Sequence, residues 1–185
     1  MSLVFCTSND IKFESAQFAC QEFGVELERA SHEVDEVQSE DPQYILSQKI
    51  IAMYKKIQKP LVVSDDSWSI PALNGFPGPY MKSVNHWFSG QDWVNLMLGH
   101  KDKRIFLIAR LAYIDSDEVV TTFEETYERK FLEKASSRPG VPILQATSFP
   151  DSDIPNNERQ ADDPRGYHSQ RKVWADFLNW YKTNQ

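Results

Sequence analysis

The sequence has few cysteines and no obvious arrangement of metal ligands, and both absences restrict what the protein can be. Its two cysteines, Cys6 and Cys20, lie in a strand-like and a helix-like apolar segment. We therefore expect two buried free thiols rather than a disulfide. The four histidines show no ligand spacing with each other or with the thiols, so a zinc site is not supported.

Long apolar runs and excess positive charge are also absent. No apolar run approaches the roughly 18 to 20 residues of a membrane span, and the N-terminus lacks the pattern of a signal peptide. We expect no membrane association and a cytoplasmic location. The net charge of −7 argues against nucleic acid as a partner. An acidic protein that handles a phosphorylated ligand would need a locally basic pocket or a metal ion.

The chain is long and apolar enough to form one folded domain over residues 1–185. It has 41% hydrophobic residues, which is enough for a sizeable core. Strand patterns alternate with helical patterns in the first third, which predicts an α/β fold: a mixed central sheet with flanking helices. The predicted strands are 3–6, 25–27 and 60–64, and the predicted helices are 10–23 and 39–57.

Two further regions have a different character. Residues 105–114 and 119–131 predict two long strands joined by a hairpin turn, which would form a lobe over about 103–132 beside the main sheet. Residues 135–166 are rich in Pro, Ser, Asp and Asn and contain five of the ten prolines. We expect no regular structure there, and the stretch is either a loop that forms part of a pocket or a mobile excursion.

The segment "TSNDIK" is the first candidate for function. A strand that opens into a helix presents free backbone N–H groups and the positive end of the helix dipole. Together with the side chains of Thr7, Ser8, Asn9 and Lys12, this N-terminus would form a cradle for phosphate. The alternative is an ordinary capped helix with a solvated lysine.

Asp65 and Asp66 are the second candidate, because they follow the predicted strand 60–64 at its carboxyl end. Carboxylates at this place suit Mg²⁺ bound together with substrate phosphates, and a neighbouring carboxylate can activate water. The alternative is a pair of acids that cap a turn. The segment "ALNGFPGPYMK" follows, in which glycines and prolines predict a rigid turn with Lys82 directly after it.

Four segments together resemble the inosine/xanthosine triphosphate pyrophosphatase family. They are "TSNDIK", "EDPQYILSQKI", "LVVSDDSWSIPALNGFPGPYMK" and "HSQR", and they occur in the family's order. The resemblance implies hydrolysis of noncanonical purine nucleoside triphosphates to monophosphate and pyrophosphate with Mg²⁺, or with Mn²⁺ as an alternative. It also implies an elongated fold with two lobes and a cleft between them, and a homodimer.

The resemblance assigns roles to individual residues. Asp65 would activate the attacking water, and Lys82 would follow the turn as the family's lysine does. Asp41 stands where the family has a metal-binding glutamate, with Glu40 beside it and Asp66 as a further metal ligand. The triphosphate would be held by Thr7, Ser8, Asn9 and Lys12, and the base would be contacted by Ser169 and Arg171.

The chain also departs from the family pattern, as a divergent member would. Ser64 stands in place of the first of two consecutive acids, and Gln170 replaces the histidine of the serine-histidine-arginine signature. The family's glycine-aromatic-aspartate-proline motif is missing, with Leu144 and Gln145 near its place. Two other functions therefore stay open: a catalytically weak nucleotide-binding or regulatory protein, and a hydrolase of another nucleotide phosphoanhydride. The base preference is not predicted.

Overall fold

The computed structural model of the chain describes residues 2–32, 34, 37–169 and 171–184. It contains two compact units. The first comprises residues 1–65, 109–125 and 168–185, and the second comprises residues 66–108 and 126–167. Three strands, β3 (Leu61–Ser69), β5 (Arg104–Ile114) and β6 (Val120–Phe131), contribute residues to both units. Within the described residues, no helix is both long and apolar enough to cross a membrane.

The strands of the described residues form one seven-stranded sheet in the order β2-β1-β3-β5-β6-β7, with β4 paired to β3. Strand β1 (Ser2–Cys6) is parallel to β2 (Glu26–Ala30) and to β3, whereas β4 (Pro77–Gly78) is antiparallel to β3. The predicted mixed sheet with flanking helices is therefore confirmed. The long strands β5 and β6 belong to this same sheet and do not form a separate one beside it, because β5 pairs with β3.

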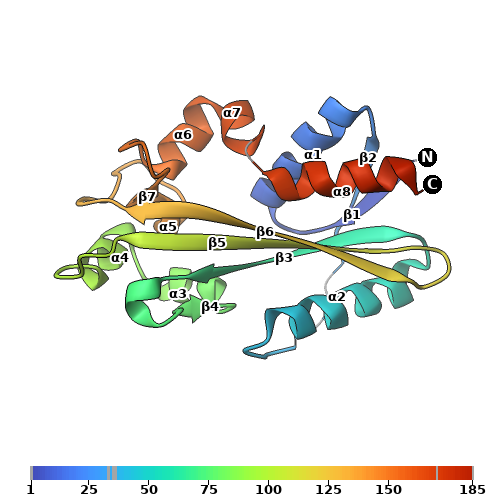
Figure 1. The fold of residues 1–185 in the computed structure, drawn as a ribbon, viewed down its shortest axis with the longest axis horizontal. Coiled ribbons are helices and arrows are strands. Elements are labelled where there is room, and N and C mark those ends of the chain that lie inside the picture. Colours follow the sequence, from blue (N-terminus) through green and yellow to red (C-terminus); the bar gives the residue numbers. More distant parts are fainter. Residues whose placement is uncertain (1, 33, 35–36, 170, 185) are drawn as a thin grey trace. The chain divides into compact units, whose positions relative to one another are not determined.

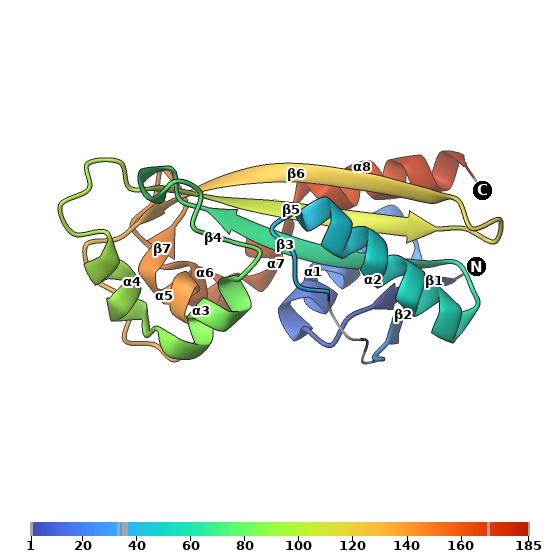
Figure 2. The same cartoon turned by 90° about the horizontal axis from the view of Figure 1, so that it is seen from below.

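In the first unit, helices cover both faces of the sheet (Figures 1 and 2). Helix α2 (Pro42–Ile57) packs on one face, where its apolar residues meet those of β1, β3 and β5. Helices α1 (Asp10–Phe23) and α8 (Lys172–Thr183) lie on the other face, where the rings of Phe5 and Trp174 are 5.0 Å apart. The predicted free thiols are confirmed, since Cys6 and Cys20 are both buried and unbridged.

In the second unit, short elements pack around Trp93. Trp93 of α4 (Gly90–Leu96) is fully buried and lies near the rings of Phe76, Phe88 and Phe131. Helix α4 packs against α5 (Pro142–Ala146), which in turn packs against α6 (Asn156–Asp162). The remaining elements are the 3-10 helix η1 (Pro71–Leu73), α3 (Met81–Trp87), β7 (Thr147–Ser148) and α7 (Pro164–Ser169), whose last residues belong to the first unit.

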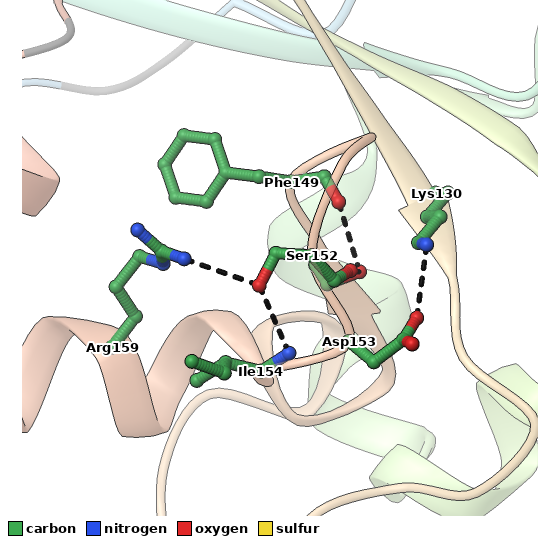
Figure 3. A network of polar contacts seen from close by, with 7 residues as sticks. Lys130, Phe149, Ser152, Asp153, Ile154 and Arg159 are labelled. Atoms are coloured by element: carbon green, nitrogen blue, oxygen red, sulfur yellow. Dashed lines mark hydrogen bonds and ion pairs between the residues drawn. The ribbon is translucent and has the colours of Figure 1, made fainter.

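The expectation that residues 135–166 lack regular structure is wrong. The stretch contains α5, β7, α6 and the start of α7, and β7 pairs with the end of β6. Side chains fix the connections: Ser152 Oγ accepts hydrogen bonds from Arg159 Nη2 and from the Ile154 N–H, and Lys130 binds Asp153 at 2.9 Å (Figure 3). Proline and serine here begin short helices and close turns, which satisfies the backbone groups locally.

Candidate active site

The N-terminus of α1 has the form that the sequence predicted. Asn9 caps the helix, with its Oδ1 accepting the Lys12 N–H at 3.2 Å, and Thr7 Oγ1 accepts the Asn9 N–H at 3.1 Å. Ser8 is exposed and Lys12 is half-buried in the first turn. The start of this 14-residue helix thus combines backbone N–H groups with hydroxyl and ammonium side chains, which is the chemistry of an anion site.

Arg29 adds a positive group to this helix start that the sequence reading missed. Its Nε donates to the Thr7 carbonyl at 3.0 Å, and its Nη1 lies 2.8 Å from Asp10 Oδ1. The guanidinium carbon also lies 5.0 Å above the centre of the Phe13 ring. Arg29 belongs to β2, and the parallel pairing of β1 with β2 brings it to the start of α1. No local sequence motif indicates this position.

Strand β3 continues beyond the two aspartates, so their predicted place at a strand end is wrong. The strand extends to Ser69, and Trp68 and Ser69 pair with β4. Successive side chains of a strand point to opposite faces, which separates Asp65 from Asp66. Asp65 shares its face with Leu61 and Val63, which belong to the α2 core. The two acids therefore do not form one side-by-side pair.

Lys49 of α2 is the partner of Asp65 on that face. Its Nζ lies 4.0 Å from Asp65 Oδ1, and the two side chains are only 15% and 17% exposed. Lys49 also acts on Cys6, whose pKa is raised to about 11 by burial, with the lysine charge working in the opposite direction. The sequence reading missed Lys49, because nothing in the helix pattern distinguishes it from the solvated lysines that follow it.

Asp41 caps helix α2, and this cap limits how it can bind a metal. Its Oδ1 accepts the N–H groups of Gln43 and Tyr44 at 2.9 and 3.3 Å, and Glu40 beside it is exposed. Among the described residues, no group of three or more acidic, histidine or cysteine side chains could hold a metal. The donors fit an ion that uses one or two carboxylates together with substrate phosphates, which is how Mg²⁺ usually binds.

The turn after β3 has the predicted backbone. Gly75 and Gly78 have positive φ values of 92° and 60°, and the Ile70 N–H donates to the Phe76 carbonyl at 3.0 Å. Lys82 follows as the second residue of α3 and is exposed. Lys82 and Asp66 belong to the second unit, whereas the other predicted site residues belong to the first.

The predicted base-binding residues lie where α7 gives way to α8. Ser169 is the last residue of α7, and Arg171 is the N-cap residue of α8. The Arg171 N–H donates to the His168 carbonyl at 3.1 Å, which holds the two ends of this turn together. Helix α7 ends at Ser169, and α8 begins at Lys172.

Ser64, the main departure within the motif, is buried in β3. Its hydroxyl oxygen has no hydrogen-bond partner within the described part of the chain. By alternation it points to the face opposite Asp65. A neutral hydroxyl therefore occupies the place where the sequence comparison expects an acid.

Comparison with known proteins shows the family of this chain. A family profile described as "Ham1 family" matches residues 3–142, which include the α1 cradle, both aspartates of β3 and Lys82. The chain belongs to the Ham1 family. Ser169 and Arg171 lie beyond the matched residues, in the part of the chain where the sequence also departs from the expected pattern.

Curated relatives agree with this assignment. A dITP/XTP pyrophosphatase of Methanopyrus kandleri is 24% identical over 184 residues, covering 100% of this chain and 98% of the relative. The Methanosarcina mazei dITP/XTP pyrophosphatase is 25% identical over 182 residues, covering 97% and 96%. The resemblance inferred from the four motifs is therefore confirmed.

Solved structures show the same fold. The Staphylococcus aureus Ham1 protein superposes with a TM-score of 0.72 at 14% identity and covers 100% of both chains. A HAM1 protein from Coxiella burnetii gives a TM-score of 0.71 at 13% identity, covering 99% of this chain and 100% of its own. At these identities the Ham1 family likeness extends to the fold alone.

Proposed function

We propose that the protein is a nucleoside triphosphate pyrophosphohydrolase that releases a nucleoside monophosphate and pyrophosphate from noncanonical nucleotides. The observation that carries this proposal is the continuous Ham1 family match, which includes the α1 cradle and Asp65. The relatives that match the full chain bear the name dITP/XTP pyrophosphatase, and a deoxyinosine or xanthosine triphosphate is accordingly the first substrate class to test.

The residues divide the work of the reaction. The N-terminus of α1, with Thr7, Ser8, Asn9 and Lys12, binds triphosphate oxygens and neutralises their charge. Asp65 accepts a proton from a water molecule, whose oxygen then attacks the α-phosphorus as the bond to the departing pyrophosphate breaks. Lys49, whose Nζ lies 4.0 Å from Asp65 Oδ1, helps to orient the Asp65 carboxylate, and Lys82 offsets charge on the pyrophosphate.

A divalent cation completes the proposed site. Asp41, Glu40 and Asp66 are the candidate carboxylates, and the ion is Mg²⁺, with Mn²⁺ as an alternative. When bound, such an ion supplies electrostatic stabilisation of the phosphate oxygens. Asp41 offers its Oδ2 for this, since Oδ1 accepts the capping hydrogen bonds of α2. Ser169 and Arg171 are the proposed base contacts.

We propose that residues 1–185 act as a single pyrophosphatase-like domain with its pocket partly formed by residues 135–166. A homodimer, a cleft between two lobes and a cytoplasmic location also remain predictions.

The proposal is tested by measuring pyrophosphate and orthophosphate release from a panel of nucleoside triphosphates. The panel contains dITP, XTP and the four common nucleotides, each with Mg²⁺, with Mn²⁺ and with EDTA. We expect metal-dependent pyrophosphate release, highest for a purine of the noncanonical class. Nucleotide binding without any release would contradict the proposal and support the catalytically weak binder that Ser64 and the missing base motif suggest. Hydrolysis of a modified pyrimidine triphosphate or nucleotide sugar alone would instead favour another phosphoanhydride as substrate.

A further inference from the structure

A buried histidine ties the end of α7 to the middle of α1. His168 is 2% exposed, and its Nδ1 lies 2.6 Å from Ser15 Oγ, which is itself 1% exposed. Its Nε2 lies 3.5 Å from Glu14 Oε2, and its ring stacks on Phe18 with the ring centres 5.6 Å apart. One side chain of α7 therefore meets three residues of α1, namely Glu14, Ser15 and Phe18, all within the first unit.

The serine, histidine and glutamate of this cluster are the residue types of a nucleophilic triad, but their environment excludes that role. Ser15 Oγ also lies 2.9 Å from the Ile11 carbonyl, as a serine does when it bonds back along its own helix. Both Ser15 and His168 are almost fully shielded from solvent, so no substrate carbonyl or phosphorus can reach the hydroxyl. The cluster is a structural contact rather than a second active site.

The place of His168 in the chain connects this contact with the proposed nucleotide site. His168 directly precedes Ser169, and its carbonyl accepts the Arg171 N–H at 3.1 Å, so it anchors the turn that carries both proposed base contacts. Helix α1, which His168 contacts, begins at Asp10 after the Asn9 cap, and its start forms the proposed phosphate cradle. A shift of His168 would move the base contacts relative to that cradle.

We propose that His168 is a positioning residue for nucleotide binding: through Ser15 it fixes the base-contacting turn at a set distance from the phosphate-binding start of α1. The proposal rests on the proposed function, because it takes the roles of Ser169, Arg171 and the cradle from it. It adds a residue that touches neither base nor phosphate and acts only through the contact with α1.

The chemistry of the contact favours a neutral imidazole. Burial, and secondly the nearby positive charge of Arg171, lower the pKa of His168 to about 4. Glu14 faces the ring from α1, but its side chain is 51% exposed and well solvated, so its attraction is the weaker influence. Because the Ser15 hydroxyl donates to the Ile11 carbonyl, a neutral ring protonated at Nδ1 can donate to the same hydroxyl oxygen, and the contact forms without a buried charge.

The test measures binding of dITP by calorimetry in EDTA, where no turnover occurs, for the wild type and four variants. Ser15→Ala removes the partner, His168→Leu removes the imidazole, and the double variant removes both. His168→Asn keeps a polar group close to the Nδ1 position. Loss of the contact is expected to raise the Kd roughly three- to tenfold in Ser15→Ala and in His168→Leu, with no further rise in the double variant.

Two controls separate positioning from general loss of stability. Ser47→Ala removes a similar serine-to-carbonyl bond within α2, Ser47 Oγ to the Tyr44 carbonyl at 2.8 Å, and should leave the Kd unchanged. His168→Asn should restore the Kd to within about twofold of the wild type, because an amide can bond to the Ser15 hydroxyl. Thermal unfolding of each variant shows that the folded protein is being measured, and Ser15→Ala keeps the test valid if His168→Leu does not fold.

The outcomes for the two proposals differ. Unchanged dITP affinity in Ser15→Ala and His168→Leu would overturn the role of His168, even if the wild type released pyrophosphate with Mg²⁺. A raised Kd in these variants without any pyrophosphate release by the wild type would support that role and overturn the proposed reaction. With turnover present, a rise in KM at constant kcat would support positioning, and wild-type KM values would contradict it. Failure of the wild type to bind dITP would overturn both.

Discussion

The Asp65 carboxylate of β3 lies next to a charged residue of another element, Lys49 of α2. The Lys49 ammonium is 4.0 Å away, and both groups are more than four-fifths shielded, so their attraction is screened far less than at the surface. The lysine charge restrains the orientation of this carboxylate, and a general base needs a fixed orientation. Asp66, its neighbour in sequence, points to the other face of β3 and cannot share this setting.

Replacing Lys49 with alanine should therefore lower kcat about ten- to a hundredfold, because Asp65 loses its compensating charge and its orientation. Lys49→Arg retains the charge and should keep most of the activity. Lys55→Ala, at an exposed lysine of the same helix, is the matched control. Steady-state pyrophosphate release measures all three, and an active Lys49→Ala enzyme would remove this residue from the mechanism.

The buried Ser64 hydroxyl leads to a prediction about the stability of the protein. Its buried hydroxyl oxygen has no hydrogen-bond partner in the described part of the chain, and leaving a polar group in this state costs about 1–3 kcal/mol. Ser64→Ala should thus leave the free energy of unfolding unchanged or raise it by about 1 kcal/mol. Urea unfolding followed by circular dichroism measures the change. A clear destabilisation would mean that the hydroxyl has a partner, such as a bound water.

Residue-level inference from the sequence succeeded where the contacts are local. The Asn9 cap and the glycine conformations of the turn follow from chemistry within four residues, and the structure has them. Lys49 and Arg29 were missed because their partners come from other elements, so nothing near them in the sequence marks their role.

Among the elements, β3 shows why a polar pair was mistaken for the end of a strand. Asp65 and Asp66 interrupt an apolar run, but β3 continues because β4 supplies a partner for Trp68 and Ser69. Residues 135–166 were misjudged for the related reason that their helices are only five to seven residues long. Helices this short show no hydrophobic period, and packing stabilises them rather than propensity.

The turn between β5 and β6 contains a strained residue, which leads to a prediction about stability. Glu118 has a positive φ of 62°, a conformation that costs a residue with a Cβ about 1–2 kcal/mol. Glu118→Gly relieves this strain, but glycine also raises the conformational entropy of the unfolded chain, which offsets part of the gain. The net effect should be a rise of roughly 0.5–1 kcal/mol in the free energy of unfolding. Glu118→Ala, which keeps the Cβ, is the control and should not stabilise. Equal stability of the two variants in urea would contradict a strained turn.

For the molecule as a whole, the buried His168 predicts how stability depends on pH. Its pKa falls from the ordinary 6.5 to about 4 on folding, mainly through burial. Between these values the unfolded chain binds a proton that the folded chain does not, so acidification favours unfolding. This one group should cost on the order of 3 kcal/mol by pH 4, with little further change below that.

The pH prediction is checked by urea unfolding at a series of pH values between 4 and 7. In His168→Asn the free energy of unfolding should depend less steeply on pH than in the wild type. His86→Asn, at an exposed histidine, should match the wild type. A wild-type slope in the His168 variant would show that this residue does not carry the effect.

The mixed sheet could be predicted from the alternation of strand and helix patterns. The family could be recognised from four motifs because they lie mostly within one continuous stretch, residues 7–82, where phosphate and acid chemistry fix the spacing. Beyond it, the base-contacting residues rest on a turn whose sequence has changed. There the structure supplied what the sequence did not: the break between α7 and α8 and the contact of His168 with α1.

The measurement that tests the proposed mechanism most directly is pyrophosphate release from dITP with Mg²⁺ by Asp65→Asn, next to the wild type and Asp151→Asn. Asp151 is an exposed carboxylate of the second unit and serves as the matched control. Asp65→Asn should bind dITP and unfold like the wild type but lose at least about a thousandfold in kcat, because no base remains to accept the proton of the water. Wild-type turnover by Asp65→Asn would contradict the assignment of Asp65 as the catalytic base.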